Sequence, residues 1–231
     1  MENVLLVSDI EYFFFCEYIK TFCDISRIII YNNTTKPFTE NIYYLCIRRI
    51  PYEILPTECK IGFINTEQLT VSSKLEEYNT TINSGKNIDI FDYSLYNISI
   101  SGKGTFLPYL ENKKETNYLK SLMPCKKEYD IAIIGHMSPH RQEIIDKLKQ
   151  QGYSVYFIVG WGNLRDKEIA KCKCIVNLHY TDEYQIYEVI RCNRWQFAGM
   201  PIYSEPCIDG LPNGVKDYSI LMEGPLVNLN E

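Results

Sequence analysis

Short apolar segments of strand length recur along this chain, and most of them are followed by a stretch with helical or turn character. This alternation constrains the fold more than any other feature, because strands joined by helices pair in parallel and need helices on the faces of their sheet. The apolar segments lie at residues 4–8, 27–31, 42–50, 60–65 and 87–91, and again at residues 130–134, 153–159, 174–178 and 201–203. The sequence therefore predicts an α/β fold with parallel sheets.

The pattern runs twice, and a polar segment separates the two runs. Residues 111–127 are rich in charged and polar side chains, whereas residue 130 opens a new near-continuous apolar strand. We therefore predict an N-terminal domain at residues 1–110, a linker at residues 111–127 and a C-terminal domain at residues 128–231. The alternative for residues 111–127 is a surface helix of a single domain.

The charge balance and the hydropathy pattern argue against several classes of protein. The 231 residues contain 24 Lys and Arg against 29 Asp and Glu, and a net charge of −5 argues against nonspecific nucleic-acid binding. No run approaches the roughly 18 apolar residues of a membrane-spanning helix. The first apolar run carries Asp9 and Glu11 and lacks a positive region before it, which indicates a first strand and helix and not a signal peptide. We expect a cytoplasmic protein without a membrane span.

The nine cysteines do not favour a metal site or a disulfide framework. The chain has no C-x2-C pair, and Cys172 and Cys174 alternate along a predicted strand, where a free cysteine behaves as a small apolar side chain. An odd number of cysteines without a secretory signal favours reduced thiols. We therefore predict no bound metal.

The turn after residue 134 has features of a phosphate-binding site. A predicted strand ends at Gly135, and a helix begins three residues later, with Ser138 as its N-cap and Pro139 as its first residue. The free N–H groups and the positive end of a helix hold phosphate, and His136, His140 and Arg141 add donors or positive charge. Many strand-to-helix turns of this kind bind nothing, so a ligand role and a structural role both remain open.

A second turn places an aromatic side chain at a strand end. Trp161 lies between Gly160 and Gly162, and the two glycines allow a close approach of the backbone. The indole ring offers a face for stacking on a nucleobase or a sugar. The alternative is that Trp161 is an apolar lid between the domains.

The stretch at residues 175–205 combines polar groups at a strand end with a predicted helix from about residue 182 to residue 198, which Gly199 and Pro201 end. Asn177, His179 and Tyr180 follow the strand, where a parallel sheet opens its ligand crevice. Glu188 on the helix could accept hydrogen bonds from two neighbouring hydroxyl groups of a sugar. The alternative is a Glu188–Arg191 pair on the helix surface, which stabilises by only ~0.3 kcal/mol.

Three acidic residues of the first half follow predicted strands. Asp9 and Glu11 come directly after the first strand, and Glu67 follows the strand at residues 60–65. Glu11 is better explained as a solvated or helix-capping carboxylate. Asp9 and Glu67 are the candidates for a catalytic base.

The order of these motifs resembles GT-B-type glycosyltransferases, in particular a family 1-like group of bacteria and large DNA viruses. The resemblance covers roughly residues 60–205 and is strongest in the second half. The residues that carry it are Asn65-Thr66-Glu67-Gln68-Leu69; Asp92-Tyr93-Ser94 with Asn97; Leu107-Pro108-Tyr109; Asp130, Gly135, Ser138-Pro139 and Arg141; Asn177-Leu178-His179-Tyr180; Glu188 with Arg191; and Ser204-Glu205.

The resemblance implies a fold and a division of roles. Two Rossmann-like domains with parallel sheets would face a cleft, and the C-terminal domain would bind a UDP- or GDP-linked sugar without a metal or another cofactor. Gly135, Ser138 and Arg141 would lie near the diphosphate, and His179, Tyr180 and Glu188 near the nucleoside or the sugar. Glu205 would lie near the position of the family's second acidic residue, although it follows Glu188 by a wider spacing than is usual.

Three functions follow as hypotheses. The first is a metal-independent glycosyltransferase of viral origin that moves a sugar from a nucleoside-diphosphate donor to a glycan or protein acceptor in the host cytoplasm, with Asp9 or Glu67 as base. The second is a non-catalytic protein that binds a nucleotide or a sugar. The third is another α/β nucleotide enzyme, such as an epimerase or a dehydrogenase, against which the missing glycine fingerprint counts. The oligomeric state is open, with a homodimer as one option.

Overall fold

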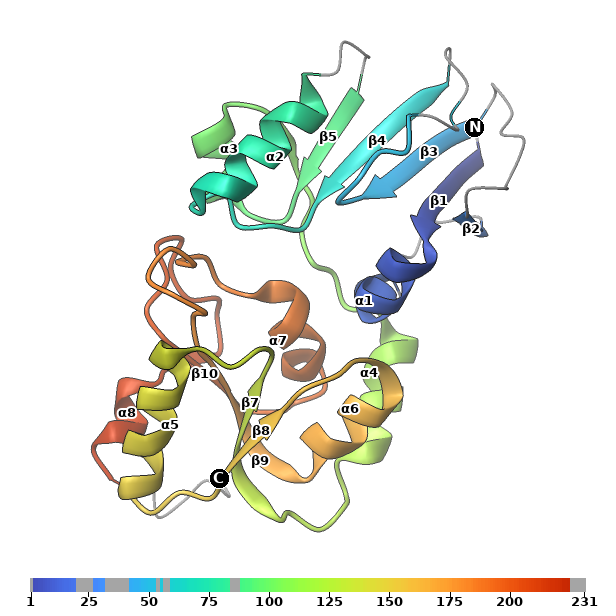
Figure 1. The fold of residues 1–231 in the computed structure, drawn as a ribbon. Coiled ribbons are helices and arrows are strands. Elements are labelled where there is room, and N and C mark those ends of the chain that lie inside the picture. Colours follow the sequence, from blue (N-terminus) through green and yellow to red (C-terminus); the bar gives the residue numbers. More distant parts are fainter. Residues whose placement is uncertain are drawn as a thin grey trace. The chain divides into compact units, whose positions relative to one another are not determined.

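The computed structural model describes residues 2–19, 27–31, 42–52, 55, 59–83 and 88–224. The chain divides into two compact units, Met1–Leu110 and Glu111–Glu231. Each unit has its own parallel sheet and its own helices, which Figure 1 shows. The predicted α/β class is confirmed, and both units are consistent with Rossmann-like domains.

The first unit contains a sheet in the order β2-β1-β3-β4-β5-β6, and all of its described pairings are parallel. Its strands are β1 (Glu2–Ser8), β2 (Arg27–Tyr31), β3 (Ile42–Ile47), β4 (Lys60–Asn65), β5 (Ile88–Asp92) and β6 (Thr105–Phe106). Its described helices are α1 (Asp9–Ile19), α2 (Ser72–Ile82) and α3 (Leu95–Ser101). Strands β1 to β5 match the apolar segments that the sequence predicts, and β6 is an additional short strand.

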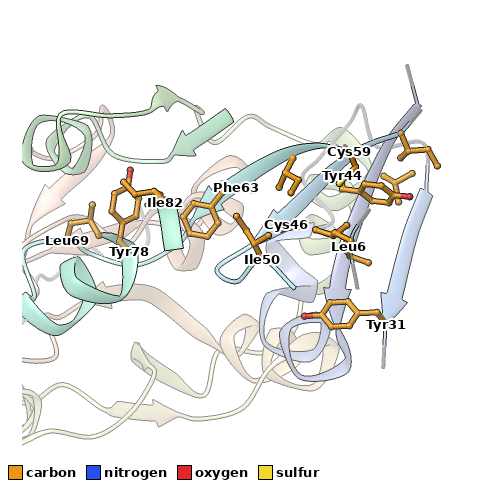
Figure 2. Close-up of a cluster of buried hydrophobic side chains, with 14 residues drawn as sticks. Leu6, Tyr31, Tyr44, Cys46, Ile50, Cys59, Phe63, Leu69, Tyr78 and Ile82 are labelled. Atoms are coloured by element: carbon orange, nitrogen blue, oxygen red, sulfur yellow. The ribbon is translucent and has the colours of Figure 1, made fainter. Parts of the chain in front are cut away.

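One face of this sheet forms a buried apolar cluster, part of which Figure 2 shows. Alternate residues of neighbouring strands contribute to it, because successive side chains of a strand point to opposite faces. Tyr44 and Cys46 on β3 and Phe63 on β4 are all buried. Helix α2 adds Tyr78, whose ring centre lies 6.0 Å from that of Phe63. Burial of the Phe63 side chain alone stabilises the unit by about 1.5–3 kcal/mol.

The second unit contains a sheet in the order β11-β10-β9-β7-β8, again with parallel described pairings. Its strands are β7 (Tyr129–Ile134), β8 (Val155–Ile158), β9 (Cys172–Asn177), β10 (Ile202–Ser204) and β11 (Val215–Asp217). Its described helices are α4 (Lys113–Leu122), α5 (Pro139–Gln150), α6 (Gly162–Ala170), α7 (Val189–Phe197) and α8 (Ser219–Met222).

Helices cover both faces of this second sheet (Figure 1). Ala132 and Ile134 of β7 belong to a cluster with residues of α4, α6 and α7. Ile131 and Ile133 belong to a second cluster with residues of α5 and α8. The near-continuous apolar run of β7 therefore arises because both of its faces are buried, as is usual for a central parallel strand.

The segment predicted as a linker, residues 111–127, is part of the second unit. Helix α4 lies within it, and Leu119 of that helix is completely buried in the core of the unit. The segment is therefore not a separate connector. Its polar residues cover one side of α4, and the other side of this helix packs on α6 and α7. Asn112 caps this helix by accepting hydrogen bonds from the backbone N–H groups of Lys114 and Glu115.

Two other elements differ from the sequence prediction. The helix expected from about residue 182 begins only at Val189. Hydrogen bonds to the loop that follows β10 hold the preceding residues in a non-helical conformation: Ile208 N donates to Gln185 O at 2.9 Å, and Tyr187 N donates to Oδ1 of Asp209 at 3.3 Å. The last described strand is β11, whereas residues 218–222, for which the sequence favours a last short strand, contain helix α8.

Within the described ranges, no helix is both long enough and apolar enough to span a membrane. Over the same ranges, no group of three or more His, Cys, Asp or Glu side chains is arranged to hold a metal ion.

Candidate functional site

The carboxyl ends of β7 and β9 form the candidate site of the second unit. Strand β7 lies between β8 and β9, so the chain leaves β7 toward one side of the sheet and later returns to the other side. Such a reversal of strand order is the place where open parallel sheets bind ligands. The two loops that meet there carry most of the binding residues predicted for this unit, from Gly135 to Arg141 and from Asn177 to Tyr180.

The loop after β7 is built around a glycine and a capped helix. Gly135 has a φ of +126°, a conformation that side-chain-bearing residues rarely adopt. Ser138 is buried, and its Oγ accepts a hydrogen bond from the backbone N–H of Arg141 at 3.2 Å, which confirms the predicted N-cap of α5. Pro139 occupies the first turn, where its missing N–H has no consequence.

Arg141 connects the two loops of the site. Its Nη1 donates to the carbonyl of His136 at 2.6 Å, its Nη2 to the carbonyl of Leu178 at 2.8 Å, and its Nε to the carbonyl of His179 at 3.1 Å. Only 3% of the residue is exposed. Burial, followed by the nearby charge of Arg191, lowers the pKa of Arg141 to about 10.

Arg191 lies on the first turn of α7, and its guanidinium group, like that of Arg141, comes close to Gly135. Its Nη1 donates to Oδ1 of Asn177 at 3.2 Å, and its Nη2 lies 3.6 Å from Oε2 of Glu188. Asn177 is itself held, because its Nδ2 donates to Oγ of Ser204 at 3.0 Å. Asn177, predicted to contact the ligand, is therefore a buried residue that orients Arg191. Glu188 is the N-cap residue of α7 and not a residue of the helix interior.

Glu205, at the end of β10, joins a third loop to the site. Its Oε1 lies 2.7 Å from Nε2 of His140, and its Oε2 accepts the backbone N–H of His179 at 2.5 Å. The ring of His179 points its Nε2 at the carbonyl of Pro206, 3.0 Å away, which favours the tautomer with the proton on Nε2. Glu205 is almost fully buried, and its carboxylate connects the loop after β10 to His140 on α5 and to the loop after β9.

A pocket of about 480 Å³ opens beside Glu205. Five of its eight lining residues carry polar or charged side chains, although apolar atoms make up more of its surface. The lining residues are His140, His179, Asp182, Gln185, Glu205, Pro206, Cys207 and Ile208. Donors and acceptors at such spacing suit a ligand rich in hydroxyl groups.

Aromatic rings stand at two places around the site. The ring of Tyr180 lies 5.7 Å from the guanidinium carbon of Arg141 and meets Tyr184 edge to face at 5.7 Å. The ring of Trp161, at the start of α6, lies 5.9 Å from the ring of His136. Tyr180 is exposed and Trp161 is half-buried, so each keeps surface that a planar ligand could cover.

The two predicted catalytic carboxylates lie in the first unit, at the carboxyl edge of its sheet. Asp9 is the exposed first residue of α1, directly after β1. Glu67 follows β4, and its two carboxylate oxygens lie 3.4 Å from Nε of Arg48 and 3.4 Å from Nζ of Lys74. Neither assignment as a base is tested by these contacts. The carboxylate of Glu11 accepts a hydrogen bond from Ser8 N, and Ser8 Oγ accepts one from Glu11 N. Glu11 therefore helps to cap α1, as the sequence predicts.

Buried polar side chains hold the loop that carries Glu67. Nδ2 of Asn65 donates to Asp92 at 2.7 Å and to the Glu67 carbonyl at 2.9 Å. Nδ2 of Asn97 donates to the same two residues, and its Oδ1 accepts from Leu69 N at 2.8 Å. Burial raises the pKa of Asp92 to about 6, although the hydrogen bonds that it accepts act in the opposite direction. The first-half motifs of the sequence are therefore one structural network.

The structure also gives two residues contacts that the sequence does not predict. The sequence favours Arg191 as a surface partner of Glu188 and His140 as a further donor of the Gly135 turn, whereas Arg191 donates to Asn177 and His140 lies against Glu205. The spacing of three residues between Glu188 and Arg191 was the available signal for Arg191, but it fits a surface ion pair equally well. The pairing of His140 with Glu205 joins residues 65 apart in sequence, which no local pattern reveals.

Comparison with known proteins finds relatives in a large DNA virus. Three uncharacterized proteins of Acanthamoeba polyphaga mimivirus are similar to this chain: protein L138 is 39% identical over 201 residues, protein L137 is 36% identical over 208 and protein L140 is 36% identical over 186. The alignments cover 85%, 84% and 78% of this chain but only 22%, 28% and 60% of the respective relatives.

The chain thus spans less than two thirds of the length of each of these relatives. The viral affinity suggested by the resemblance is supported by these three proteins. No protein-family model and no solved structure matches the chain.

Proposed function

We propose that this protein is a glycosyltransferase that takes a sugar from a nucleoside-diphosphate donor and passes it to a glycan or protein acceptor. The observation that carries the proposal is the meeting of two loops at the β7/β9 reversal, where Arg141 and Arg191 converge on Gly135 beside the start of α5. Guanidinium groups and a helix N-terminus are the groups that proteins use to bind phosphate. The GT-B arrangement of the two units belongs to the same proposal.

The roles within the second unit follow from the chemistry of each surface. The diphosphate lies at the Gly135 turn, the hydroxyl-rich sugar occupies the pocket beside Glu205, and the nucleobase stacks on Trp161 or Tyr180. When the bond between the sugar and the diphosphate breaks, negative charge develops on the leaving diphosphate. The arginines and the positive end of α5 stabilise that charge, so the transfer proceeds without a metal.

The acceptor hydroxyl loses a proton as it attacks the sugar, and in an inverting reaction a carboxylate of the first unit takes that proton. Asp9 and Glu67 remain the candidates for this base. The exposed position of Asp9 leaves its carboxylate accessible, whereas both carboxylate oxygens of Glu67 already lie 3.4 Å from cations of its own unit, Arg48 and Lys74. We therefore favour Asp9. We expect this chemistry to occur in the host cytoplasm.

Calorimetric titration against a panel of UDP- and GDP-sugars tests the proposal. We expect one donor class to bind with a dissociation constant in the micromolar range, about −8 kcal/mol of binding free energy. Incubation with the bound donor then tests turnover through the release of free nucleoside diphosphate. The absence of binding across the whole panel would exclude the proposed function.

A non-catalytic nucleotide- or sugar-binding protein is the second candidate. The observation in its favour is the engagement of Glu67 and Glu205, each of which has both carboxylate oxygens near donors. Donor binding without any hydrolysis or transfer, in wild type and in Asp9→Asn alike, would favour this candidate.

A further inference from the structure

We propose that Arg191 is the residue that binds the diphosphate directly and that Arg141 is a positioning residue that shapes the binding turn. The inference concerns the same site as the proposed function and rests on it for the identity of the ligand. It differs from the expectation from the sequence, in which Arg141 lies near the diphosphate and Arg191 accompanies Glu188 without a contact to the diphosphate.

The guanidinium group of Arg141 already donates hydrogen bonds to the protein backbone. Its three guanidinium nitrogens all donate to backbone carbonyl oxygens, from the loop after β7 and from the loop after β9. A ligand that replaced these acceptors would leave three carbonyl groups without this donor, and a buried group such as the Leu178 carbonyl then costs about 1–3 kcal/mol. The side chain is also nearly inaccessible, with 3% of the residue exposed. These hydrogen bonds allow Arg141 to hold the loop after β7 and the loop after β9 together.

Arg191 keeps donors for a ligand. Within the described residues its hydrogen bond goes to Asn177, and its contact with Glu188 at 3.6 Å is too long to be a hydrogen bond. Its side chain is 18% exposed, in contrast to that of Arg141. Asn177 and Ser204 hold the guanidinium in place from behind, so little side-chain entropy is lost when an anion binds.

The two arginines meet at Gly135. A methyl group built on this glycine would lie 2.8 Å from Nη1 of Arg141 and 3.6 Å from Nη2 of Arg191. Two positive charges at such proximity repel each other, and Arg141 has only carbonyl acceptors among the described residues. An oxyanion placed at Gly135 would relieve this repulsion, and the charge-assisted hydrogen bonds would form to the exposed member, Arg191.

Binding of inorganic pyrophosphate to the intact chain tests this assignment by titration calorimetry. We expect Arg191→Gln to weaken the binding about 10- to 100-fold, since a hydrogen bond between charged groups is lost. We expect Arg191→Lys, which keeps the charge, to recover part of that loss. The matched control is Lys167→Gln, which removes an exposed positive charge from α6 and is expected to change the affinity less than twofold.

Arg141→Lys separates positioning from charge. Lysine keeps the positive charge but cannot reach the three carbonyl groups from one planar head. We expect weaker pyrophosphate binding with the salt dependence of wild type, whereas Arg191→Gln also reduces the salt dependence because it removes a charge from the contact. Circular dichroism at the assay temperature checks that the variant is folded. Gly135→Ala, which displaces the Arg141 guanidinium, is the second variant with the same expected effect.

The assignment is wrong if wild type does not bind pyrophosphate, or if Arg191→Gln binds it as wild type does. It is also wrong if Arg141→Lys, in its folded state, leaves the affinity unchanged. Pyrophosphate binding that depends on Arg191, combined with no response to any nucleotide sugar, would instead reject the proposed function and keep the anion site.

Discussion

At the scale of single residues, buried or half-buried polar side chains tie the strand ends of the second unit together. Asp130 is one example: its Oδ2 accepts hydrogen bonds from N and Oγ of Ser154, and its Oδ1 pairs with Nζ of Lys173 at 2.9 Å. It thereby joins the start of β7 to β8 and β9. Partial burial opposes the charge of Asp130, but the hydrogen bonds from Ser154 and Lys173 outweigh it, so its pKa is lowered.

We predict that Asp130→Asn destabilises the second unit at pH 7 by about 1–2 kcal/mol, because a charged acceptor is lost. A carboxyl whose pKa is lowered by folding contributes stability above its unfolded-state pKa and loses that contribution as the pH falls through its folded-state pKa. The difference between wild type and variant should therefore shrink in acid. Urea unfolding followed by tryptophan fluorescence measures it, since both tryptophans, Trp161 and Trp195, lie in this unit.

The control for this prediction is Asp146→Asn, an exposed residue of α5 whose replacement should change stability by less than about 0.5 kcal/mol. A stability difference for Asp130→Asn that stays constant from pH 7 to strongly acidic solution would contradict the proposed role of its charge.

At the scale of elements, one buried ion cluster fixes three helices of the second unit. Arg194 on α7 pairs in a bidentate manner with Asp166 on α6, with both N–O distances at 3.1 Å, and with Glu115 on α4. Arg194 and Asp166 are almost completely buried. Burial opposes the charge of Arg194, but the two carboxylates outweigh it and raise its pKa. Glu115 lies in the segment expected to be a linker, which explains how α4 joins this unit.

We predict that Arg194→Ala lowers the free energy of unfolding of this unit by about 3–5 kcal/mol, because two buried carboxylates lose their counter-charge. Chemical denaturation followed by tryptophan fluorescence measures the effect. The simultaneous replacement of Arg194 by Met, Asp166 by Leu and Glu115 by Leu should recover most of the loss, since no buried charge then remains. If the free energy of unfolding of Arg194→Ala lies within about 1 kcal/mol of wild type, the cluster contributes little to stability.

At the scale of the whole molecule, each unit has a separate apolar core. The buried cluster of the first unit lies on its own sheet, and the two clusters of the second unit lie on the two faces of the other sheet. The proposed donor site is built from loops of the second unit alone.

We predict that residues 111–231 fold without the first unit and bind pyrophosphate with the affinity of the full chain. The physical reason is that all of the described contacts of Arg141, Arg191 and Glu205 lie within this part of the chain. A cooperative urea transition and a calorimetric titration test the prediction. An isolated segment that is unfolded, or that no longer binds pyrophosphate, would show that the first unit completes the site.

The sequence by itself determined the class of the fold and most of its elements. Apolar segments of strand length predicted β1 to β5 and β7 to β10, and Ser138 with Pro139 predicted the first residue of α5. These signals succeed because strand burial and helix capping depend on residues that are neighbours in the chain. The sequence also predicted the turn at Gly135 and the loop at Asn177 as the places where polar groups gather.

Only the tertiary structure decided what each of these polar groups does. Nothing local distinguishes Arg141, which clamps two loops, from Arg191, which keeps donors for a ligand. Their roles depend on carbonyl groups and an asparagine that lie 14 to 38 residues away in sequence. The order of the strands in the sheet brings those residues together, and burial then decides which charge remains accessible.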